Sequence, residues 1–256
     1  MKSHTLEQAL PQLPDDIYVT GKGGVGKSSV AMRIAEIRGS QLFVMEERGA
    51  PRGATVVPAR EAVEDAAAIA FNSRRLARLV LRPRAIRRFL AVTPGLAELC
   101  RMMKVQREKH RKTTDLPATG HAIDWLAGPE KFLTIVQSGR GREMIIDLLE
   151  AWKNPERSGL LVVTTPEALV VSETKALIAA LESQSPMAIS AVLINKGLRC
   201  SEAVESELQT HAGAGSEEAA RAVHRIQATK AAEKAFARYP TILMEFDVQI
   251  GEVMAA

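Results

Sequence analysis

The stretch of the chain best suited to chemistry is a glycine-rich loop at residues 21–29. It reads Gly21-Lys22-Gly23-Gly24-Val25-Gly26-Lys27-Ser28-Ser29 and fits the pattern G-x-x-x-x-G-K-[ST]. The glycines let backbone N–H groups turn toward phosphate oxygens, and a following helix adds its positive N-terminal end. In this pattern Lys27 reaches the β- and γ-phosphates, and the Ser28 hydroxyl binds Mg²⁺. The loop therefore predicts a binding site for a nucleoside triphosphate and Mg²⁺.

The segments on either side of the loop are of the kind that would position it. Residues 17–20 are β-branched and aromatic and predict a short buried strand, and residues 30–36 predict a helix. A phosphate loop requires this order of strand, loop and helix. The alternative, a glycine-rich turn with no ligand, does not explain why all three segments agree.

An additional lysine, Lys22, lies directly after the first glycine of the loop. The resulting sequence GKGGVGKS resembles the deviant phosphate loop of the ATPase family that contains MinD, ParA, the nitrogenase iron protein, and the arsenite-pump and tail-anchored-protein targeting ATPases. The resemblance implies that ATP is the nucleotide and that Lys22 reaches across a dimer interface to the nucleotide of the other subunit. The dimer would be a homodimer or a heterodimer with a paralogue. A solvated loop lysine is the alternative interpretation.

A second motif, D-x-P-x-T-G-H, occupies residues 115–121. It resembles switch II of the arsenite-pump and tail-anchored-protein targeting branch. The resemblance implies that Asp115 is the carboxylate on the metal side of the site and that Gly120 is a hinge. A plain turn rich in proline and glycine is the alternative. The segment from Thr165-Pro166-Glu167 to Glu173-Thr174 is similar to a P-E…E-T segment of the same branch.

Asn195 ends the apolar run 192–194, where that branch uses an asparagine to read adenine. An amide can donate and accept a hydrogen bond at once, which suits the edge of the base. The resemblance therefore implies a base-reading role for Asn195. The alternative is a turn residue at the end of a strand.

The chain departs from that branch in its switch I loop, which usually carries an aspartate that positions the attacking water. The equivalent stretch here begins Glu46-Glu47 and contains no aspartate up to Gly53. Glu46 or Glu47 could take the role, since either carboxylate can orient water. In the alternative interpretation both are solvated or salt-bridged. We therefore expect slow hydrolysis by the protein alone.

A further departure precedes Asp115, where residues 110–114 are His-Arg-Lys-Thr-Thr. Switch II should follow an apolar strand, and this polar run predicts no buried parallel strand. The strand is then either very short or lost from this segment. The zinc-binding C-x-x-C of the eukaryotic targeting factor is also absent.

Apolar runs and helical patterns alternate along the rest of the chain. They predict an α/β fold, doubly wound, with a mainly parallel sheet, flanking helices and a helical insertion at about residues 60–113, all in one domain over residues 1–256. Within the insertion the pattern predicts one helix over 59–81, a break at Pro83, a helix over 85–92 and a helix start at Thr93-Pro94. Further strands are expected at 41–45, 160–163, 191–194 and 240–244, and further helices at 142–152, 172–181 and 216–238.

The composition is that of an ordinary soluble protein, with 46% hydrophobic and 25% charged residues in 256. Aromatic residues make up only 4%, which argues against stacking platforms for single-stranded nucleic acid. Cys100 and Cys200 form no C-x-x-C pair and fit a reducing compartment. No apolar run is long enough to span a bilayer, and the first residues lack the apolar core of a signal peptide. We therefore expect a cytoplasmic protein.

One segment is strongly basic, with no acidic residue between Asp65 and Glu98. Apolar residues alternate there with seven arginines: Arg74, Arg75, Arg78, Arg82, Arg84, Arg87 and Arg88. Arginine binds phosphate and carboxylate groups in bidentate fashion, so the Arg74–Arg88 segment could meet an acidic client protein, anionic lipid or, less favoured, nucleic acid. The alternative is a pair of amphipathic helices with solvated arginines.

Together the motifs predict a dimeric Mg-ATP hydrolase that acts as a switch for binding a client or partner protein. A positioning ATPase similar to MinD and ParA is a second hypothesis. The D-x-P-x-T-G-H loop and the lack of a clear amphipathic anchor after Met244 weigh against it. A third hypothesis is a nucleotide-binding structural subunit that hydrolyses little and is paired with an active paralogue.

Overall fold

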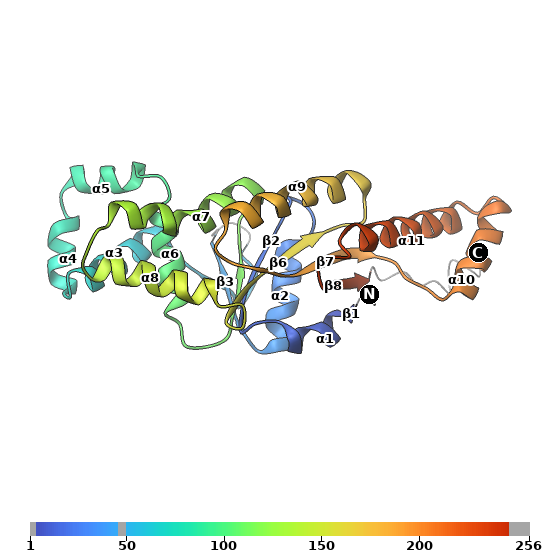
Figure 1. Cartoon of the computed structure of the whole chain (residues 1–256), viewed down its shortest axis with the longest axis horizontal. Coiled ribbons are helices and arrows are strands. Elements are labelled where there is room, and N and C mark those ends of the chain that lie inside the picture. The colour runs from blue at the N-terminus through green and yellow to red at the C-terminus, as the bar shows by residue number, and fades with distance from the viewer. Residues whose placement is uncertain (1–3, 46–49, 246–256) are drawn as a thin grey trace.

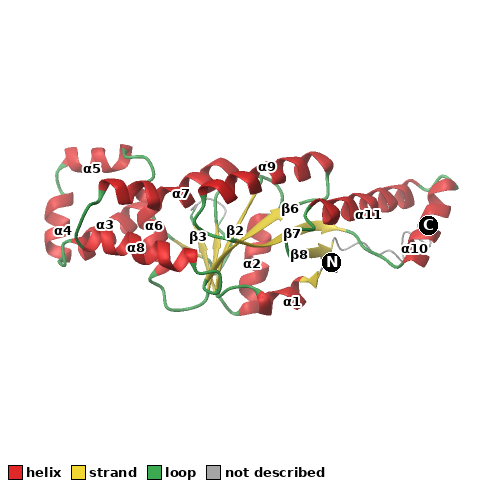
Figure 2. Ribbon diagram, in the orientation of Figure 1, coloured by secondary structure: helices red, strands yellow, loops and turns green. Residues whose placement is uncertain are grey.

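An eight-stranded parallel sheet forms the centre of the protein, with helices on both of its faces (Figures 1 and 2). The structure is a computed structural model, and it describes residues 4–45 and 50–245. The strand order is β1-β8-β7-β6-β2-β5-β3-β4, and every neighbouring pair is parallel. The predicted fold class, a doubly wound α/β fold, is confirmed.

The strands are β1 (His4–Thr5), β2 (Asp16–Gly21), β3 (Gln41–Val44), β4 (Thr55–Val56), β5 (Lys112–Asp115), β6 (Ser158–Thr164), β7 (Ile189–Gly197) and β8 (Thr241–Glu245). The helices are α1 (Leu6–Ala9), α2 (Lys27–Arg38), α3 (Ala59–Ala70), α4 (Arg74–Leu81), α5 (Arg84–Val92), α6 (Leu96–Gln106), α7 (Thr119–Ile135), α8 (Arg140–Lys153), α9 (Ala168–Gln184), α10 (Glu202–Gly213) and α11 (Glu217–Ala235), with a 3₁₀ turn at Leu10–Gln12. Among the described residues, none of the helices combines the length and apolar character needed to cross a membrane.

Strands β2, β3, β6 and β7 each contribute to two hydrophobic clusters, one on either face of the sheet. In β2, Tyr18 packs into the cluster under α6, α7 and α8, whereas Ile17 and Val19 pack into the cluster under α1 and α2. In β6, Leu160 packs into the first of these clusters and Leu161 into the second. Successive side chains of a strand point to opposite faces, so continuous apolar runs are what a sheet covered on both sides requires.

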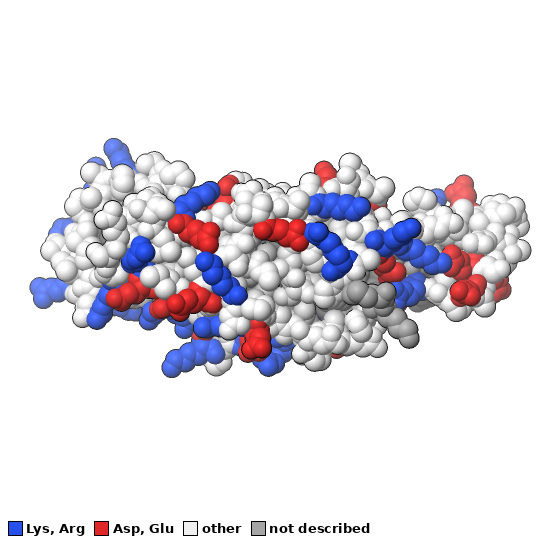
Figure 3. Space-filling view, in the orientation of Figure 1, with Lys and Arg blue, Asp and Glu red and all other residues white. Residues whose placement is uncertain are grey.

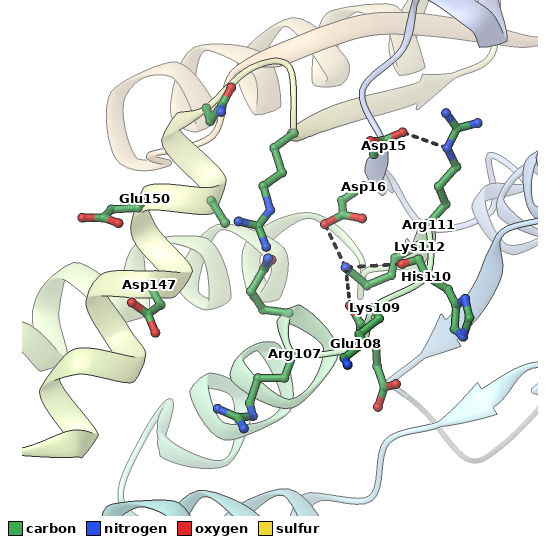
Figure 4. A pocket seen from close by; sticks show the side chains of 14 residues that line it. Asp15, Asp16, Arg107, Glu108, Lys109, His110, Arg111, Lys112, Asp147 and Glu150 are labelled. Carbon is green, nitrogen blue, oxygen red and sulfur yellow. Dashed lines mark hydrogen bonds and ion pairs between the residues drawn. The ribbon is translucent and has the colours of Figure 1, made fainter.

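The prediction that the polar run before Asp115 forms no buried parallel strand is wrong. Residues Lys112–Asp115 form β5, between β2 and β3, and the first three of them are buried. Lys112 Nζ lies 3.0 Å from Asp16 Oδ2 and donates to the Glu108 carbonyl at 3.0 Å (Figure 4). The Thr113 and Ser40 hydroxyls are 2.7 Å apart and share a hydrogen bond. Pairing of the Lys112 and Thr113 side chains offsets much of the cost of burying them, so a very short polar strand can lie inside the sheet.

The insertion contains four helices, α3 to α6, rather than the three predicted. The expected helix over 59–81 breaks at Asn72, which has a positive φ of 52°. The Ser73 hydroxyl then caps α4 by accepting from the Leu76 N–H at 3.2 Å. The expected helix start at Thr93-Pro94 is also wrong, because Thr93 ends α5 and α6 begins at Leu96. Helices α4 and α5 lie at one end of the molecule, away from the sheet (Figure 1).

Four elements went unpredicted: β1, β4, α7 and α10. Helix α7 begins at Thr119, inside the expected loop, so Gly120 lies in the first turn of a helix. Helices α10 and α11 form a hairpin at the end of the molecule opposite α4 and α5 (Figure 1). Its small core contains Leu208, Ala222 and Ile226.

Candidate functional site

The glycine-rich loop joins β2 to α2 at the carboxyl edge of the sheet. The strand order reverses around β2, with β3 and β5 on one side and β6 to β8 on the other. In open α/β sheets ligands bind at the carboxyl ends of strands near such a reversal. The predicted phosphate loop therefore occupies the place where this fold binds ligands.

Two glycines of the loop pack too closely against neighbouring strands for any other residue. Gly21 has φ +152°, and a Cβ there would lie 2.3 Å from the Val163 carbonyl oxygen in β6. Gly26 has φ +89°, and a Cβ there would lie 2.5 Å from Asn195 Nδ2 in β7. By contrast, a Cβ at Gly23 or Gly24 would meet no atom within 4 Å. The loop is thus anchored at its two ends and open in the middle.

Three predicted site residues meet beside this loop. The Ser28 hydroxyl donates to Asp115 Oδ2 at 2.5 Å, which joins the start of α2 to the end of β5. Lys27 Nζ lies 3.5 Å from the Lys22 carbonyl oxygen. A cavity of about 200 Å³ opens between them and is lined by Lys27, Ser28, Val44, Met45, Ala50, Pro51, Asp115, Leu116, Pro117 and Ala118. The structure therefore brings together residues that are 87 positions apart in the chain.

The donors at this cavity fit Mg²⁺ held jointly by protein and phosphate. Mg²⁺ prefers oxygen ligands and is usually bound through one or two protein groups together with substrate phosphates. The Ser28 hydroxyl and the Asp115 carboxylate are oxygen donors of this kind and already lie in contact. Among the described residues, no group of three or more His, Cys, Asp or Glu side chains could hold a metal ion without such help.

Lys22 forms an ion pair with Glu173 of α9 in the same chain. Both side chains are partly exposed, with relative accessibilities of 36% and 39%. The next residue of α9, Thr174, is buried, and its hydroxyl lies 2.9 Å from the Thr164 hydroxyl at the end of β6. Reaching a nucleotide in another subunit would therefore require Lys22 to leave Glu173. Both residues belong to the motifs described above, but the sequence did not predict that they pair.

The Asn195 side chain fastens the phosphate loop to β7. It is buried, its Nδ2 donates to the Val25 carbonyl at 2.8 Å, and its Oδ1 accepts from the Lys196 N–H at 2.9 Å. One of the two N–H donors and one of the two oxygen lone pairs of the amide are thus used within the protein. Reading of adenine by Asn195 stays a prediction.

Two further predicted residues, Glu46 and Glu47, lie outside the described residues. The chain resumes at Ala50 and Pro51, which line the cavity beside Asp115. The end of the predicted switch I loop is therefore next to the predicted switch II. The remaining loop residue, Ser29, is exposed in the first turn of α2.

A second, larger cavity of about 900 Å³ lies at the opposite, amino edge of the sheet (Figure 4). Its lining is charged and includes Asp16, Lys112 and Asp147. Burial raises the pKa of Asp16 despite the opposing hydrogen bond from Lys112. The sequence did not predict this cavity, because its residues come from three separate segments, 15–16, 106–112 and 147–157.

A buried chain of hydrogen bonds lies behind that cavity. Trp152 Nε1 donates to the Tyr18 hydroxyl at 3.0 Å, and the Tyr18 hydroxyl donates to Gln106 Oε1 at 3.4 Å. Burial raises the pKa of Tyr18, so the phenol keeps the proton that it donates. These contacts link α8, β2 and α6, which gives them a role in holding the helices to the sheet.

Comparison with known proteins adds no assignment to this site. No protein-family model matches the chain, and a comparison with curated proteins found no match. The case for function therefore depends on the residues and their geometry.

Proposed function

We propose that the chain binds and hydrolyses Mg-ATP at the carboxyl edge of its sheet and uses the nucleotide to control a dimeric switch. The observation that carries the proposal is the 2.5 Å hydrogen bond between Ser28 and Asp115. It joins a hydroxyl that the loop motif assigns to Mg²⁺ with a carboxylate from the second nucleotide motif. The resemblance to the arsenite-pump and tail-anchored-protein targeting ATPases supports the same proposal.

Each residue of the site has a distinct part in it. The open backbone at Gly23 and Gly24, together with the N-terminus of α2, binds phosphate oxygens. Lys27 neutralises charge on the β- and γ-phosphates, and Ser28 and Asp115 orient the metal side of the site. When bound, Mg²⁺ supplies positive charge against the phosphate oxygens. Catalysis of phosphoryl transfer is mostly positioning and charge stabilisation, which are what such residues provide.

The switch would operate through Lys22. In the single chain its ammonium group is paired with Glu173. Exchange of this partner for a phosphate of a second subunit would couple nucleotide binding to dimer closure and free Glu173 on α9. A homodimer, or a heterodimer with a paralogue, would then present a changed surface to a client protein. The two free cysteines, Cys100 and Cys200, fit the reducing cytoplasm in which we place this switch.

Calorimetric titration with ATP in the presence of Mg²⁺ tests the proposal. We expect the Lys27→Ala variant to bind ATP about 100-fold more weakly, because hydrogen bonds between charged partners contribute about 1.5–3 kcal/mol. The Lys175→Ala variant is the matched control, since Lys175 is exposed on α9. Equal affinity of wild type and Lys27→Ala for ATP would refute the assignment of this loop as the ATP-binding site. We expect Ser28→Ala to reduce the effect of Mg²⁺ on affinity more than the affinity itself.

A weakly hydrolysing structural subunit is the second candidate, favoured by the lack of an aspartate between Glu46 and Gly53. ATP turnover separates it from the first. We expect slow turnover that falls further in Glu46→Gln or Glu47→Gln, since one of these carboxylates would position water. Binding of ATP without turnover, alone or with cell extract, would support the structural subunit. Brisk turnover unchanged in both variants would exclude both glutamates from the role.

A further inference from the structure

The basic segment identified in the sequence forms an exposed amphipathic surface at one end of the molecule. We define the α4–α5 surface as the exposed side chains of residues 71–92, which lie on and beside helices Arg74–Leu81 and Arg84–Val92. All seven of its arginines are exposed. Within the described part of the chain, Arg74 alone of the seven has a carboxylate within ion-pair distance, with Asp65 at 4.0 Å. In the space-filling view, basic side chains project from this end of the molecule (Figure 3).

The same surface exposes large apolar side chains. Six of the ten large apolar residues that are exposed in the described chain fall between residues 71 and 92. They are Phe71, Leu76, Leu79, Ile86, Phe89 and Val92, and the last two have relative accessibilities of 65% and 75%. Contiguous exposed apolar residues bordered by charge are typical of interaction sites rather than of free protein surface.

Each helix separates its apolar and basic residues onto different sides. In α5, Ile86, Phe89 and Leu90 follow the i, i+3, i+4 spacing of one helical face. Arg84, Arg87 and Arg88 follow the same spacing on the opposite face. The apolar face of a surface helix normally packs on the core, yet no residue of α5 whose burial is described is buried. Helix α5 contacts the neighbouring helices α4 and α6.

We propose that the α4–α5 surface binds the headgroup region of an anionic lipid bilayer. An interfacial helix combines arginines on one face with Leu, Ile and Phe on the other and lies flat in the membrane surface. Arginine matches lipid phosphate in bidentate fashion, and the exposed apolar side chains reach the acyl boundary. An acidic protein would pair with the arginines but would have to supply a separate groove for Leu79, Phe89 and Val92. The outward-facing, terminal position of α4 and α5 suits a broad deformable surface instead (Figure 1). The inference goes beyond the ATP site and does not depend on nucleotide.

Flotation of the protein with vesicles, without nucleotide and at low salt, tests the proposal. Vesicles of equal parts phosphatidylcholine and phosphatidylglycerol should carry the protein, and vesicles of phosphatidylcholine alone should not. The triple variant Arg84→Glu/Arg87→Glu/Arg88→Glu should bind at least about tenfold more weakly, because each basic residue near an anionic surface contributes measurably to binding. The matched control, Arg33→Glu/Arg60→Glu/Arg221→Glu, makes the same change of net charge at exposed arginines elsewhere and should bind as wild type does.

The apolar side chains have a test of their own. Ile86→Ser/Phe89→Ser keeps every charge and should still reduce binding to the anionic vesicles several-fold, because the acyl contact is lost. Circular dichroism checks that each variant is folded. The proposal fails if the wild type does not bind anionic vesicles, or if either α4–α5 variant binds them as the wild type does. It also fails if the control triple variant loses as much binding as the Arg84→Glu/Arg87→Glu/Arg88→Glu variant does. Retention by polyglutamate or duplex DNA, with no binding to vesicles, would also overturn it and assign the surface to a protein or nucleic-acid partner.

Discussion

The two edges of the sheet use the same kinds of residue in opposite ways. At the amino edge, Asp16 is buried and paired with Lys112, so both charges are occupied within the protein. At the carboxyl edge, Asp115 contacts the neutral, exposed hydroxyl of Ser28. Both edges border a cavity, of about 900 Å³ at the amino edge and about 200 Å³ at the carboxyl edge, so the two carboxylates differ in their partners. The ion pair at the amino edge is suited to stabilising the fold, and the residues at the carboxyl edge are suited to binding a ligand. Carboxylates at the ends of strands are therefore distinguished by the groups they contact, and their residue type alone does not reveal their role.

The largest expected effect concerns the amino edge. The Lys112→Met variant should lose about 3–5 kcal/mol of unfolding free energy, because it leaves Asp16 buried without its cation. The double variant Asp16→Leu/Lys112→Met should recover much of that loss, since apolar side chains replace a buried pair well. Urea unfolding measures both, with Lys175→Met as the exposed control. A Lys112→Met protein of unchanged stability but weaker ATP binding would reverse the roles assigned to the two edges.

Substitution of Asn195 tests how much its hydrogen bonds stabilise the glycine-rich loop at the carboxyl edge. The Asn195→Ala variant removes the hydrogen bonds to the Val25 carbonyl and from the Lys196 N–H. We expect a loss of about 1–3 kcal/mol in unfolding free energy, together with weaker ATP binding. Asn154→Ala is the matched control at the amino edge, where the exposed Asn154 side chain accepts from the Glu156 N–H. A larger loss in the control would mean that the loop does not depend on Asn195.

A smaller effect is expected for the pair between Lys22 and Glu173. Exposed ion pairs contribute about 0.2–1 kcal/mol, so Glu173→Gln should favour a nucleotide-dependent dimer by about two- to fivefold at most. Light scattering with a non-hydrolysable ATP analogue measures this. Glu182→Gln is the control on the same helix, since Glu182 pairs with Arg238 far from the loop. A monomer in every nucleotide state would refute the dimer.

The smallest expected effect is a pH dependence. Burial holds the folded pKa of Asp16 above its ordinary value of 3.8. The folded protein therefore binds this proton more tightly than the unfolded chain does. The resulting stabilisation is complete below the unfolded pKa and is lost as pH rises through the folded pKa. The free energy of unfolding of the wild type should thus rise relative to that of Asp16→Asn as pH falls toward about 3. If the difference in unfolding free energy between the two proteins narrows on acidification, the effect of Lys112 on the pKa of Asp16 outweighs the effect of burial.

The success of sequence prediction differed between the two edges for a physical reason. The phosphate loop is a local pattern in which strand, glycines and helix are consecutive, so residues 17–36 contain what is needed to predict it. Strand β5 depends on Asp16 and Ser40, which are distant in the chain, and its own residues look unsuited to burial. The ion pair between Lys22 and Glu173 was missed for the same reason.

The prediction of helix boundaries failed where a single backbone angle or capping residue determines them. Asn72 divides α3 from α4 by adopting a positive φ, although neither glycine nor proline lies nearby to indicate a break. Gly95 takes the left-handed conformation before α6, so the helix begins after it rather than at Thr93-Pro94. Local motifs predicted which residues gather at the candidate site, whereas their pairing partners needed the three-dimensional arrangement.

The pairing of β1 with β8 bears on how this chain is made. His4 lies beside Ile242 in the sheet, so β1 pairs with a strand that is synthesised after all the other described strands. Every other strand pair is parallel as well and needs a crossover, which makes the native contacts distant in sequence and their formation slow. During translation β1 would therefore remain without its neighbour until residues Thr241–Glu245 have left the ribosome. Until then β1 is exposed to mispairing, and chaperones act on chains at this stage.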